Sequence, residues 1–381
     1  MKYKIEFAGT PTQLELIKAM GSKNPIEARA AQQVFATLLA PTVDEVFQQA
    51  ETTGLIYQDL PFTEDSDPSF PLELFTDVPE GYFTITSQNM PGGLPTNTVH
   101  QPIEEVKFTT YKLMGTISYL TKYARQTRLP VIAKAIERLL QEVLVKTQAN
   151  AWMVVFAALA KAKTNNEGHV YSVTTPGALT LDDFNGLITY FKRLNRSWAG
   201  GTPVGGASRP TDAVVSPETM GKLRAMAWNP INTKGPNNTT IATPNSNGDG
   251  VTLPESQRAA IYNSAGVPEF FGIALTELLE LGVNQPYNVL FESYMGSDTF
   301  TKIDKTGSES FDPATDDLML VLDRTRDIAF RAIATDSDTG ARFNLVPDDQ
   351  FVTRSEKTSW IGYVQEGRMV LDTRGIAGLV I

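Results

Sequence analysis

Cysteine is absent from this chain of 381 residues, and only two histidines, His100 and His169, occur in it. Without cysteine the protein can form no disulfide, no thiolate metal site and no cysteine nucleophile. The two histidines do not stand at a spacing that would ligate one metal ion, and we expect both to be surface residues. The sequence therefore assigns no catalytic residue, no metal ligand and no cofactor-binding residue.

Positive charge is also scarce, because 33 lysines and arginines face 43 aspartates and glutamates, which gives a net charge of −10. Tight binding to a phosphate backbone needs clustered basic residues, so this composition argues against sequence-specific DNA binding.

Long apolar runs are missing as well. The longest, residues 151–160, is about half of the ~20 residues that a membrane-spanning helix needs, and lysines flank it. We expect a buried helix there and not a membrane anchor. The first twenty residues lack the apolar stretch of a secretory signal, which predicts that the protein stays where it is made.

Two short motifs resemble ligand-binding loops but lack an essential residue. Residues 201–208, GTPVGGAS, have the glycines of a phosphate-binding loop, but Ala207 stands where the lysine is required and no helix follows. Residues 336–340 resemble the start of a calcium-binding loop, but Pro347 stands where the bidentate glutamate is required. We interpret the first as a flexible surface loop and the second as a solvated turn.

Adjacent carboxylates and scattered tryptophans are also better explained structurally. Neighbouring residues on a strand point to opposite faces, so adjacent acids make poor general acid–base couples. An acidic helix start is the simpler explanation for two of the four pairs, Asp182–Asp183 and Asp316–Asp317. The tryptophans lie outside basic stretches, which indicates core or interface positions. The other pairs are Glu104–Glu105 and Asp348–Asp349, and the tryptophans are Trp152, Trp198, Trp228 and Trp360.

Residues 25–51 have the pattern of an N-terminal helical arm. Asn24 and Thr42 are suitable N-caps, and Pro41 ends an apolar helical pattern. We predict two short helices, 25–40 and 43–51, joined at the proline. Together they are too small to bury a core alone.

Repeated prolines between residues 60 and 102 exclude a long helix. Strand-like runs at 82–87 and 106–118 flank a turn at Gly92–Gly93. We predict an extended two-stranded loop. Such a hairpin is only marginally stable in water, so it requires another surface, which a neighbouring subunit can supply.

The strongest helix signal begins at Pro130 and continues, with apolar residues at spacings of three and four, through Leu159. The pattern extends for about 33 residues to a stop near Asn165–Asn166, which corresponds to a length near 50 Å. Ordinary globular helices have about 11 to 12 residues. We therefore expect a strut along which other elements pack.

An α/β alternation and a set of closing strands are predicted beyond this helix, and no internal repeat is present. The predicted elements are a helix at 182–196, a buried strand at 211–216, a helix from Ser216 and Pro217 to 228, a strand at 287–294, a helix at 316–334, strands at 350–354, 358–365 and 368–372, and an apolar tail at 376–381. The predicted loops are 199–210 and 229–254.

This order of elements resembles the major capsid proteins of tailed bacteriophages, whose fold is named for phage Hong Kong 97 and is shared with encapsulins. The most specific stretch is residues 106–138, VKFTTYKLMGTISYLTKYARQTRLPVIAKAIER. In that family a similar segment leads from the extended loop through a backbone strand into the spine helix, and here Tyr111, Lys112, Leu113 and Gly115 stand at its positions.

Two further stretches resemble the same family. Residues 212–223 are similar to the strand-to-helix junction of the axial domain, and residues 351–381 to the closing strands of the peripheral domain. One departure is the sequence KAKTNNEGHVY after the spine helix, where many members carry a glycine-rich turn. The resemblance covers most of the chain.

The resemblance implies an α+β protein of the Hong Kong 97-type major capsid fold. It implies an N-terminal arm (1–59), an extended β-hairpin loop (60–112), a peripheral domain (113–180) with the spine helix (130–164), an axial domain (181–300), and a closing helix and strands of the peripheral domain (301–381). The loop tip would contact a neighbouring copy through Met90, Gly92, Gly93, Leu94 and Asn97.

The resemblance also implies a function, which is not enzymatic. The chain would assemble as pentamers and hexamers into the icosahedral head of a tailed phage that encloses double-stranded DNA. It would be assembled in the host cytoplasm and located in the virion. Its partners would be other copies of itself, scaffold, portal and decoration proteins, and packaged DNA through weak non-specific contact, with no membrane and no cofactor.

Other functions remain open at this stage. An encapsulin-like nanocompartment would share the fold but enclose an enzyme cargo. A carboxylate-dependent hydrolase would require two buried acids that face each other in a concave pocket. A tail-tube protein fits poorly with a long helix preceded by a hairpin.

Overall fold

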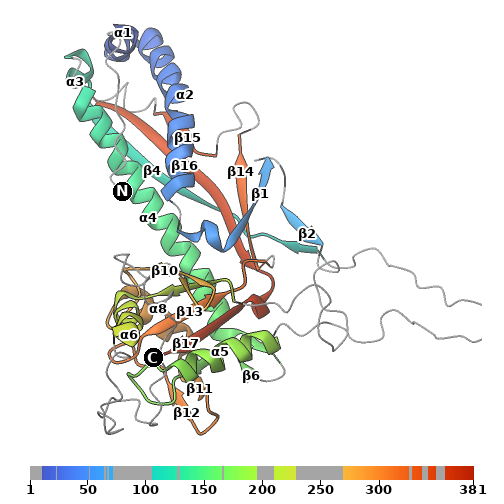
Figure 1. Ribbon diagram of the computed structural model, residues 1–381. Helices are drawn as coiled ribbons and strands as arrows, with labels where there is room; N and C mark the ends of the chain where they lie inside the picture. Colours follow the sequence, from blue (N-terminus) through green and yellow to red (C-terminus); the bar gives the residue numbers. More distant parts are fainter. Residues whose placement is uncertain are drawn as a thin grey trace, which may run out of the picture. The chain divides into compact units, whose positions relative to one another are not determined.

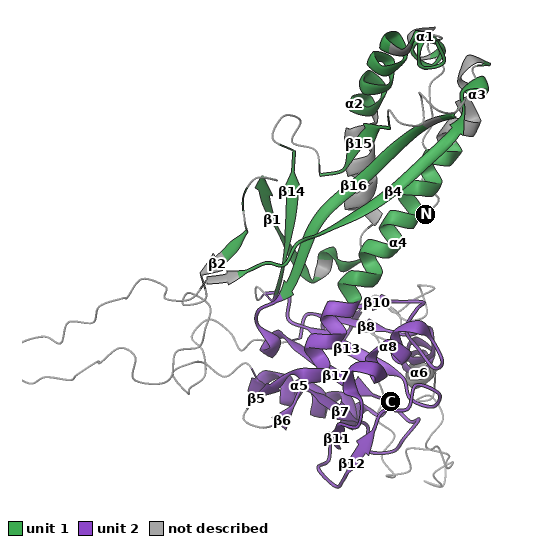
Figure 2. Ribbon diagram, turned by 180° about the vertical axis from the view of Figure 1, so that it is seen from behind, with its two compact units in different colours: residues 1–71, 105–152, 329–369 green, residues 72–104, 153–328, 370–381 purple. Residues whose placement is uncertain are grey.

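The computed structural model describes residues 11–22, 24–50, 52–63, 66, 68–71, 105–126, 129–164, 167–194, 210–228, 269–325, 328–336, 342–348 and 357–381. The chain divides into two compact units, each built from separate stretches of sequence (Figure 2). Unit 1 comprises residues 1–71, 105–152 and 329–369, and unit 2 comprises 72–104, 153–328 and 370–381. Both contain helices and sheets, so the expected α+β class is confirmed.

Unit 1 is built on a five-stranded sheet around one long strand, β16. β4 and β15 pair with β16 in antiparallel fashion, and β1 pairs with β14 in parallel. A separate antiparallel pair, β2 with β3, stands where the chain leaves and re-enters the unit. The strands are β1 (Tyr57–Thr63), β2 (Ser69–Pro71), β3 (Glu105–Lys107), β4 (Tyr111–Leu120), β14 (Ala329–Thr335), β15 (Asn344–Pro347) and β16 (Lys357–Val370).

Helices cover one face of this sheet (Figure 1). Trp360 and Gly362 are two residues apart on β16 and therefore lie on the same face of the strand. Their contacts show that this is the face that the helices cover. Trp360 stacks on Phe35 of α2, with ring centroids 5.2 Å apart, and Leu139 of α4 packs over Gly362. The helices of unit 1 are α1 (Pro11–Met20), α2 (Pro25–Ala50), the 3₁₀ turn η1 (Thr53–Leu55), α3 (Thr121–Arg125) and the first part of α4 (Leu129–Lys161).

Helix α4 has 33 residues, as its periodicity predicts. Its buried residues Ile136, Leu139, Leu140 and Val143 follow the i, i+3, i+4, i+7 spacing of one helical face and belong to the core of unit 1. The later residues, 155–160, contribute fully buried side chains in unit 2. Residues 134–161 are long and apolar enough to cross a membrane, but core helices pass the same test. In this structure one face of α4 is buried in the core of unit 1, and Val155, Phe156 and Leu159 are buried in unit 2.

Unit 2 contains an eight-stranded sheet in the order β12-β11-β7-β17-β13-β8-β10-β9. The predicted apolar tail forms β17, which lies between β7 and β13 and is buried throughout. Continuous apolar runs are typical of strands covered on both faces. The strands are β7 (Val170–Ser172), β8 (Asp212–Val215), β9 (Glu269–Phe270), β10 (Ile273–Glu277), β11 (Thr299–Lys302), β12 (Ser308–Ser310), β13 (Leu318–Leu322) and β17 (Ile376–Val380), with a short separate pair β5 (Lys163–Thr164) and β6 (Glu167–Gly168).

Three described α-helices belong wholly to unit 2, namely α5 (Leu181–Leu194), α6 (Pro217–Trp228) and α8 (Pro286–Met295), together with the 3₁₀ turn η4 (Thr373–Gly375). The predicted strand before α6 and the N-cap at Ser216 are confirmed, since Ser216 Oγ accepts a hydrogen bond from Thr219 N at 3.0 Å. The acidic start of α5 is confirmed too. Asp183 is buried there and accepts hydrogen bonds from the hydroxyl groups of Thr174 and Thr180.

Pro41 does not divide the N-terminal arm, since residues 25–50 form the single helix α2. The predicted N-cap Asn24 is confirmed, because its Oδ1 accepts a hydrogen bond from Ile26 N. An internal proline costs a helix about 3 kcal/mol. Packing of α2 against α1 and β15 offsets this cost, and no local signal in the sequence reports that packing.

Two other predicted elements are of the wrong type. Residues 287–294 belong to helix α8, whose start at Pro286 and buried Asn288, Phe291 and Met295 give it helical spacing. Residues 316–334 contain strands β13 and β14, and their described part contains no helix. Asp316–Asp317 is therefore no helix start. Short apolar runs are compatible with either structure, and burial on both faces removes the alternation that marks a strand.

Several predictions concern residues outside those described. These are His100, Trp198, residue 104 of the first acidic pair, residue 349 of the last, the strands at 82–87 and 350–354, the loop at 229–254, and both motif loops, apart from Pro210 and Asp336 at their ends. The predicted strands 358–365 and 368–372 form one strand, β16, which ends at Val370. Trp152 and Trp360 are buried in the core, as predicted.

His169 is wholly buried, so the expectation of a surface histidine is wrong. Its Nδ1 lies 2.8 Å from the carbonyl oxygen of Thr373 and 3.1 Å from that of Ile376. Carbonyl oxygens only accept, so Nδ1 carries the proton and donates. Burial lowers the pKa of His169 below its usual 6.5, and the two carbonyl hydrogen bonds only partly oppose this shift. The ring is therefore neutral in the folded protein near neutral pH.

This burial predicts a loss of stability in mild acid. The unfolded chain takes up a proton on His169 as the pH falls below about 6.5, whereas the folded chain does not, so the free energy of unfolding falls with pH by at most ~1.4 kcal/mol per unit. We expect His169→Gln to reduce this pH dependence when urea unfolding is measured between neutral and mildly acidic pH. Equal pH slopes for both proteins would contradict a neutral buried imidazole. His100 is present in both proteins, so its contribution to the pH dependence cancels in the comparison.

Candidate functional site

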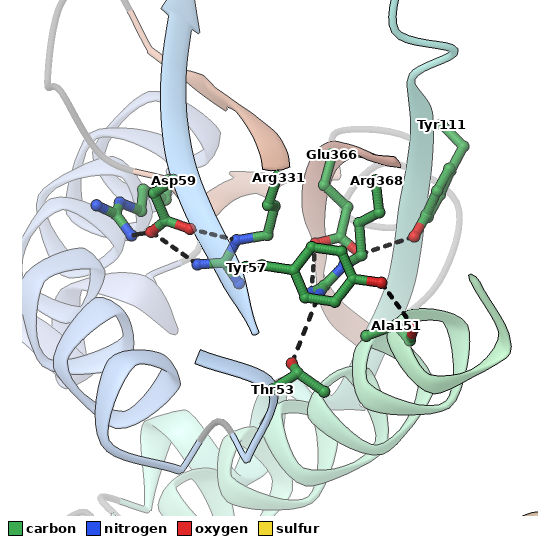
Figure 3. Close-up of polar contacts among 9 residues, drawn as sticks. Thr53, Tyr57, Asp59, Tyr111, Ala151, Arg331, Glu366 and Arg368 are labelled. Carbon is green, nitrogen blue, oxygen red and sulfur yellow. Dashed lines mark hydrogen bonds and ion pairs between the residues drawn. The ribbon is translucent and has the colours of Figure 1, made fainter. Parts of the chain in front are cut away.

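A buried ion pair lies near the C-terminal end of β16 in unit 1. Glu366 and Arg368 are two residues apart on β16, so their side chains leave the same face of the strand. Their side chains are 1% and 0% exposed, and Arg368 Nη2 lies 3.0 Å from Glu366 Oε2 (Figure 3). A second contact joins Arg368 Nε to Glu366 Oε1 at 3.3 Å. Burying two charges is costly unless both are paired and hydrogen-bonded, so neighbouring groups have to complete the site.

Those neighbours come from other segments of unit 1. Tyr111 at the start of β4 donates its hydroxyl to Glu366 Oε1 at 2.8 Å. Arg368 Nη1 donates to Thr53 Oγ1 at 3.3 Å, and the guanidinium lies 4.9 Å from the ring centroid of Tyr57. We call these five residues, Thr53, Tyr57, Tyr111, Glu366 and Arg368, the Arg368 cluster.

Helix α4 joins the same cluster through Tyr57, whose hydroxyl donates to the carbonyl oxygen of Ala151 at 2.8 Å (Figure 3). Burial, and then the negative charge of Glu366, raises the pKa of Tyr111 to about 12. Tyr111 therefore keeps its proton and remains a donor at any physiological pH. The Arg368 cluster thus fastens η1, β1, β4 and α4 to one strand.

A second cluster fixes β1 against β14. Asp59 and Arg331 are opposite each other in the parallel register, and the guanidinium binds both carboxylate oxygens, at 2.7 and 2.8 Å. Arg342 Nη1 adds a contact of 2.7 Å to Asp59 Oδ2. Burial alone would raise the pKa of Asp59, but the hydrogen bonds and charges of the two arginines outweigh it and lower the pKa. Asp59, Arg331 and Arg342 form the Asp59 cluster.

The two clusters hold the two ends of residues 72–104. The chain passes through β1 with Asp59 and then β2 before this segment, and through β3 and then β4 with Tyr111 after it. β2 and β3 pair with each other, so the segment leaves and re-enters unit 1 at one place. The two clusters have a structural role, because their charged side chains are already paired and their hydroxyl groups already form hydrogen bonds.

The described residues offer little that could carry a reaction. None of their His, Asp and Glu side chains form a group of three or more that could hold a metal ion. Buried Asp317 accepts hydrogen bonds from Ser216 and Thr219, and buried Asp183 from two threonines. A groove of about 150 Å³ between β4 and α4 is lined mainly by aliphatic side chains, with Glu142 and Lys146 as its charged residues.

The loop-tip residues predicted from the sequence, Met90, Gly92, Gly93, Leu94 and Asn97, lie outside the described residues and stay a prediction. Sequence reasoning missed the Arg368 cluster, although it noted Tyr111 as part of a family-like segment. One signal was available: Glu366 and Arg368 interrupt an otherwise uncharged run from Ser359 to Leu371. The i, i+2 spacing places both charges on one face of a strand, where they can pair.

Comparisons with known proteins give matches at the level of structure. No protein-family model matches the chain, and no curated protein matches it. Among solved structures, it is similar to the capsid of cyanophage P-SCSP1u (13% identity, 85% of each chain covered, TM-score 0.44). It is also similar to the mature capsid of bacteriophage PhiM1 (12% identity, 85% of this chain and 84% of that one, TM-score 0.43).

A third similar structure is the holo-SrpI encapsulin complex from Synechococcus elongatus, with 10% identity, 86% of this chain and 85% of that one covered, and a TM-score of 0.45. Phage capsids and encapsulins are the two kinds of protein that the sequence resembles. At these identities and TM-scores we transfer no residue's role from the matched proteins.

Removing one partner of the buried pair should destabilise unit 1 strongly. Arg368→Met leaves Glu366 buried without its counter-charge, which we expect to lower the free energy of unfolding by ~3–5 kcal/mol. The double variant with Glu366→Met removes both charges and should recover most of that loss. Urea unfolding followed by circular dichroism measures both. A double variant as unstable as the single one would show that the unpaired charge is not the cause.

The exposed pair Arg138–Glu142 provides a matched control. Its side chains are 81% and 70% exposed, so Arg138→Met should change the free energy of unfolding by less than about 1 kcal/mol.

Gly367, between the two charged residues, should not tolerate a methyl group. A Cβ there would lie 2.9 Å from the backbone oxygen of Thr109, which cannot move without shifting the chain before β4. We expect Gly367→Ala to cost ~1–3 kcal/mol in the same unfolding measurement. Gly115→Ala is the control, because its methyl group meets the end of the Leu139 side chain beside the groove. Equal losses for both variants would show that backbone crowding is not decisive.

Proposed function

We propose that this chain is the subunit of a protein shell, and specifically the major capsid protein of a tailed phage. The observation that carries the proposal is the fastening of both ends of residues 72–104 to one sheet, with β2 paired to β3 at their base. A segment that holds a neighbouring subunit needs firmly fixed ends. The Arg368 and Asp59 clusters provide such a base.

The order of elements supports the same proposal. A helical arm, the fastened segment, a 33-residue helix and closing strands follow one another, as the sequence resemblance implies. Within this proposal the boundaries are an arm at 1–59, an extended loop at 60–112, peripheral segments at 113–180 and 301–381, and an axial domain at 181–300. The loop tip, with Met90, Gly92, Gly93, Leu94 and Asn97, contacts a neighbouring copy.

The assembled form we propose is an icosahedral head built of pentamers and hexamers around double-stranded DNA. A heterologous contact that closes by rotation generates such rings. The chain is then located in the virion after assembly in the host cytoplasm, with scaffold, portal and decoration proteins as partners. Its net charge of −10 favours weak, non-specific contact with the packaged DNA.

Expression of the full chain, alone and with its neighbouring genes, tests this proposal. We expect closed shells, or rings of five and six subunits, when the purified material is imaged by electron microscopy. The ultraviolet absorbance ratio then shows whether the shells contain nucleic acid, which indicates a capsid. A co-purifying enzyme indicates an encapsulin-like compartment. A compact monomer under every condition, co-expression included, would contradict the shell.

A further inference from the structure

Helix α2 has an apolar ridge on the side that faces away from its own unit. Its inner side is buried, with Ala28, Ala31 and Phe35 2%, 7% and 4% exposed. On the outer side Ile26, Val34 and Leu38 are 78%, 50% and 58% exposed. Together with exposed Ala30 they stand at intervals of four residues, which places them in one row along the helix. We call these four residues the α2 ridge.

The middle of α2 lacks the charges of a solvent-facing helix, whereas Glu27 and Arg29 stand near its start and Asp44 and Glu45 near its end. No charged residue occurs from Ala30 to Val43, between Arg29 and Asp44. The solvent side of α4 shows the usual pattern, with the exposed residues Lys134, Arg138, Glu142 and Lys146. A helical stretch of this length without charges on any side is typical of one that is covered on both sides. Among the described residues, those of the unit cover only one side of this stretch.

We propose that the α2 ridge packs against the α2 ridge of a second copy of this chain. Rows of residues four apart on two helices interdigitate in the commonest class of helix packing, and small Ala30 lets the two backbones approach. A two-fold contact brings a surface patch against its own copy, so a charged patch would repel itself. The α2 ridge is uncharged and apolar, so it can pack against its own copy without repulsion.

The size of the ridge fits a contact made inside an assembly. Ile26 to Leu38 spans about 18 Å of helix, and one such stripe buries less than the ~800 Å² per partner of a standard stable interface. A pair of copies is therefore held weakly by this contact alone. Subunits that are already linked by other contacts meet at high effective concentration, so the ridge becomes occupied. In this respect the inference rests on the proposed shell.

The absence of cysteine makes a direct test available. A single cysteine introduced at Ala30, Val34 or Leu38 can form a disulfide only with the same residue of another copy. The bond requires Cα atoms about 4.4–6.8 Å apart, so the position nearest the helix crossing should react best. We expect at least one of the three variants to give ten times more disulfide dimer than Gln141→Cys, an exposed control on α4, when assembled particles are mildly oxidised.

The outcomes separate this inference from the proposed function. If shells form but no ridge variant exceeds the control, the ridge contact is wrong and the shell stands. If no shell forms, the shell proposal fails, and the same oxidation is applied to the concentrated chain. Ridge-specific dimers would then support the contact, and their absence would overturn it.

A charge on the ridge provides a second, independent measurement. Val34→Asp places a carboxylate against its own copy and should reduce ridge-dependent association at least tenfold, as followed by sedimentation velocity. Gln141→Asp makes the same change of charge at an exposed position of α4 and should leave association unchanged. Thermal unfolding of each variant confirms that it folds. Equal association of the two folded variants would contradict the contact.

Discussion

The buried pair of Glu366 and Arg368 is the constraint on which the rest of unit 1 depends. In a sheet, a slip of one residue would turn every side chain to the opposite face. Such a slip in β16 would place both charges on a face where Tyr111 and Thr53 could not reach them. An apolar pair could give similar stability. A charged pair adds a penalty for any register but the native one, which fixes β4 and β1 as well.

Fixing these strands has a consequence for the segment between them. Residues 72–104 begin and end beside each other, at β2 and β3, and the strands on either side are held by buried or partly buried charges. In the proposed shell, a force on that segment would be passed to the sheet and to α4, whose Ala151 accepts the Tyr57 hydroxyl. This is what a subunit needs if its neighbours hold it by a loop.

The sequence predicts these features unevenly, for physical reasons. Helix α4 and the strand-to-helix junction at Ser216 follow from local signals, namely periodicity and an N-cap. Residues 316–334 do not, because burial on both faces of β13 and β14 erases the alternation that marks a strand. The burial of His169 and the partners of Arg368 depend on segments far away in sequence. Spacing alone carries no information about such partners.

The described contacts also differ in strength in a way that suits assembly. Within unit 1 the chain is held by buried charges that cannot separate without a large cost. In the proposed shell, the narrow α2 ridge would give a weak contact between copies, which could break and re-form. Weak contacts allow misplaced subunits to leave, and their number makes a closed assembly stable. A rigid subunit with weak outer contacts therefore corrects its errors before closure, whereas a subunit with stronger contacts would trap them.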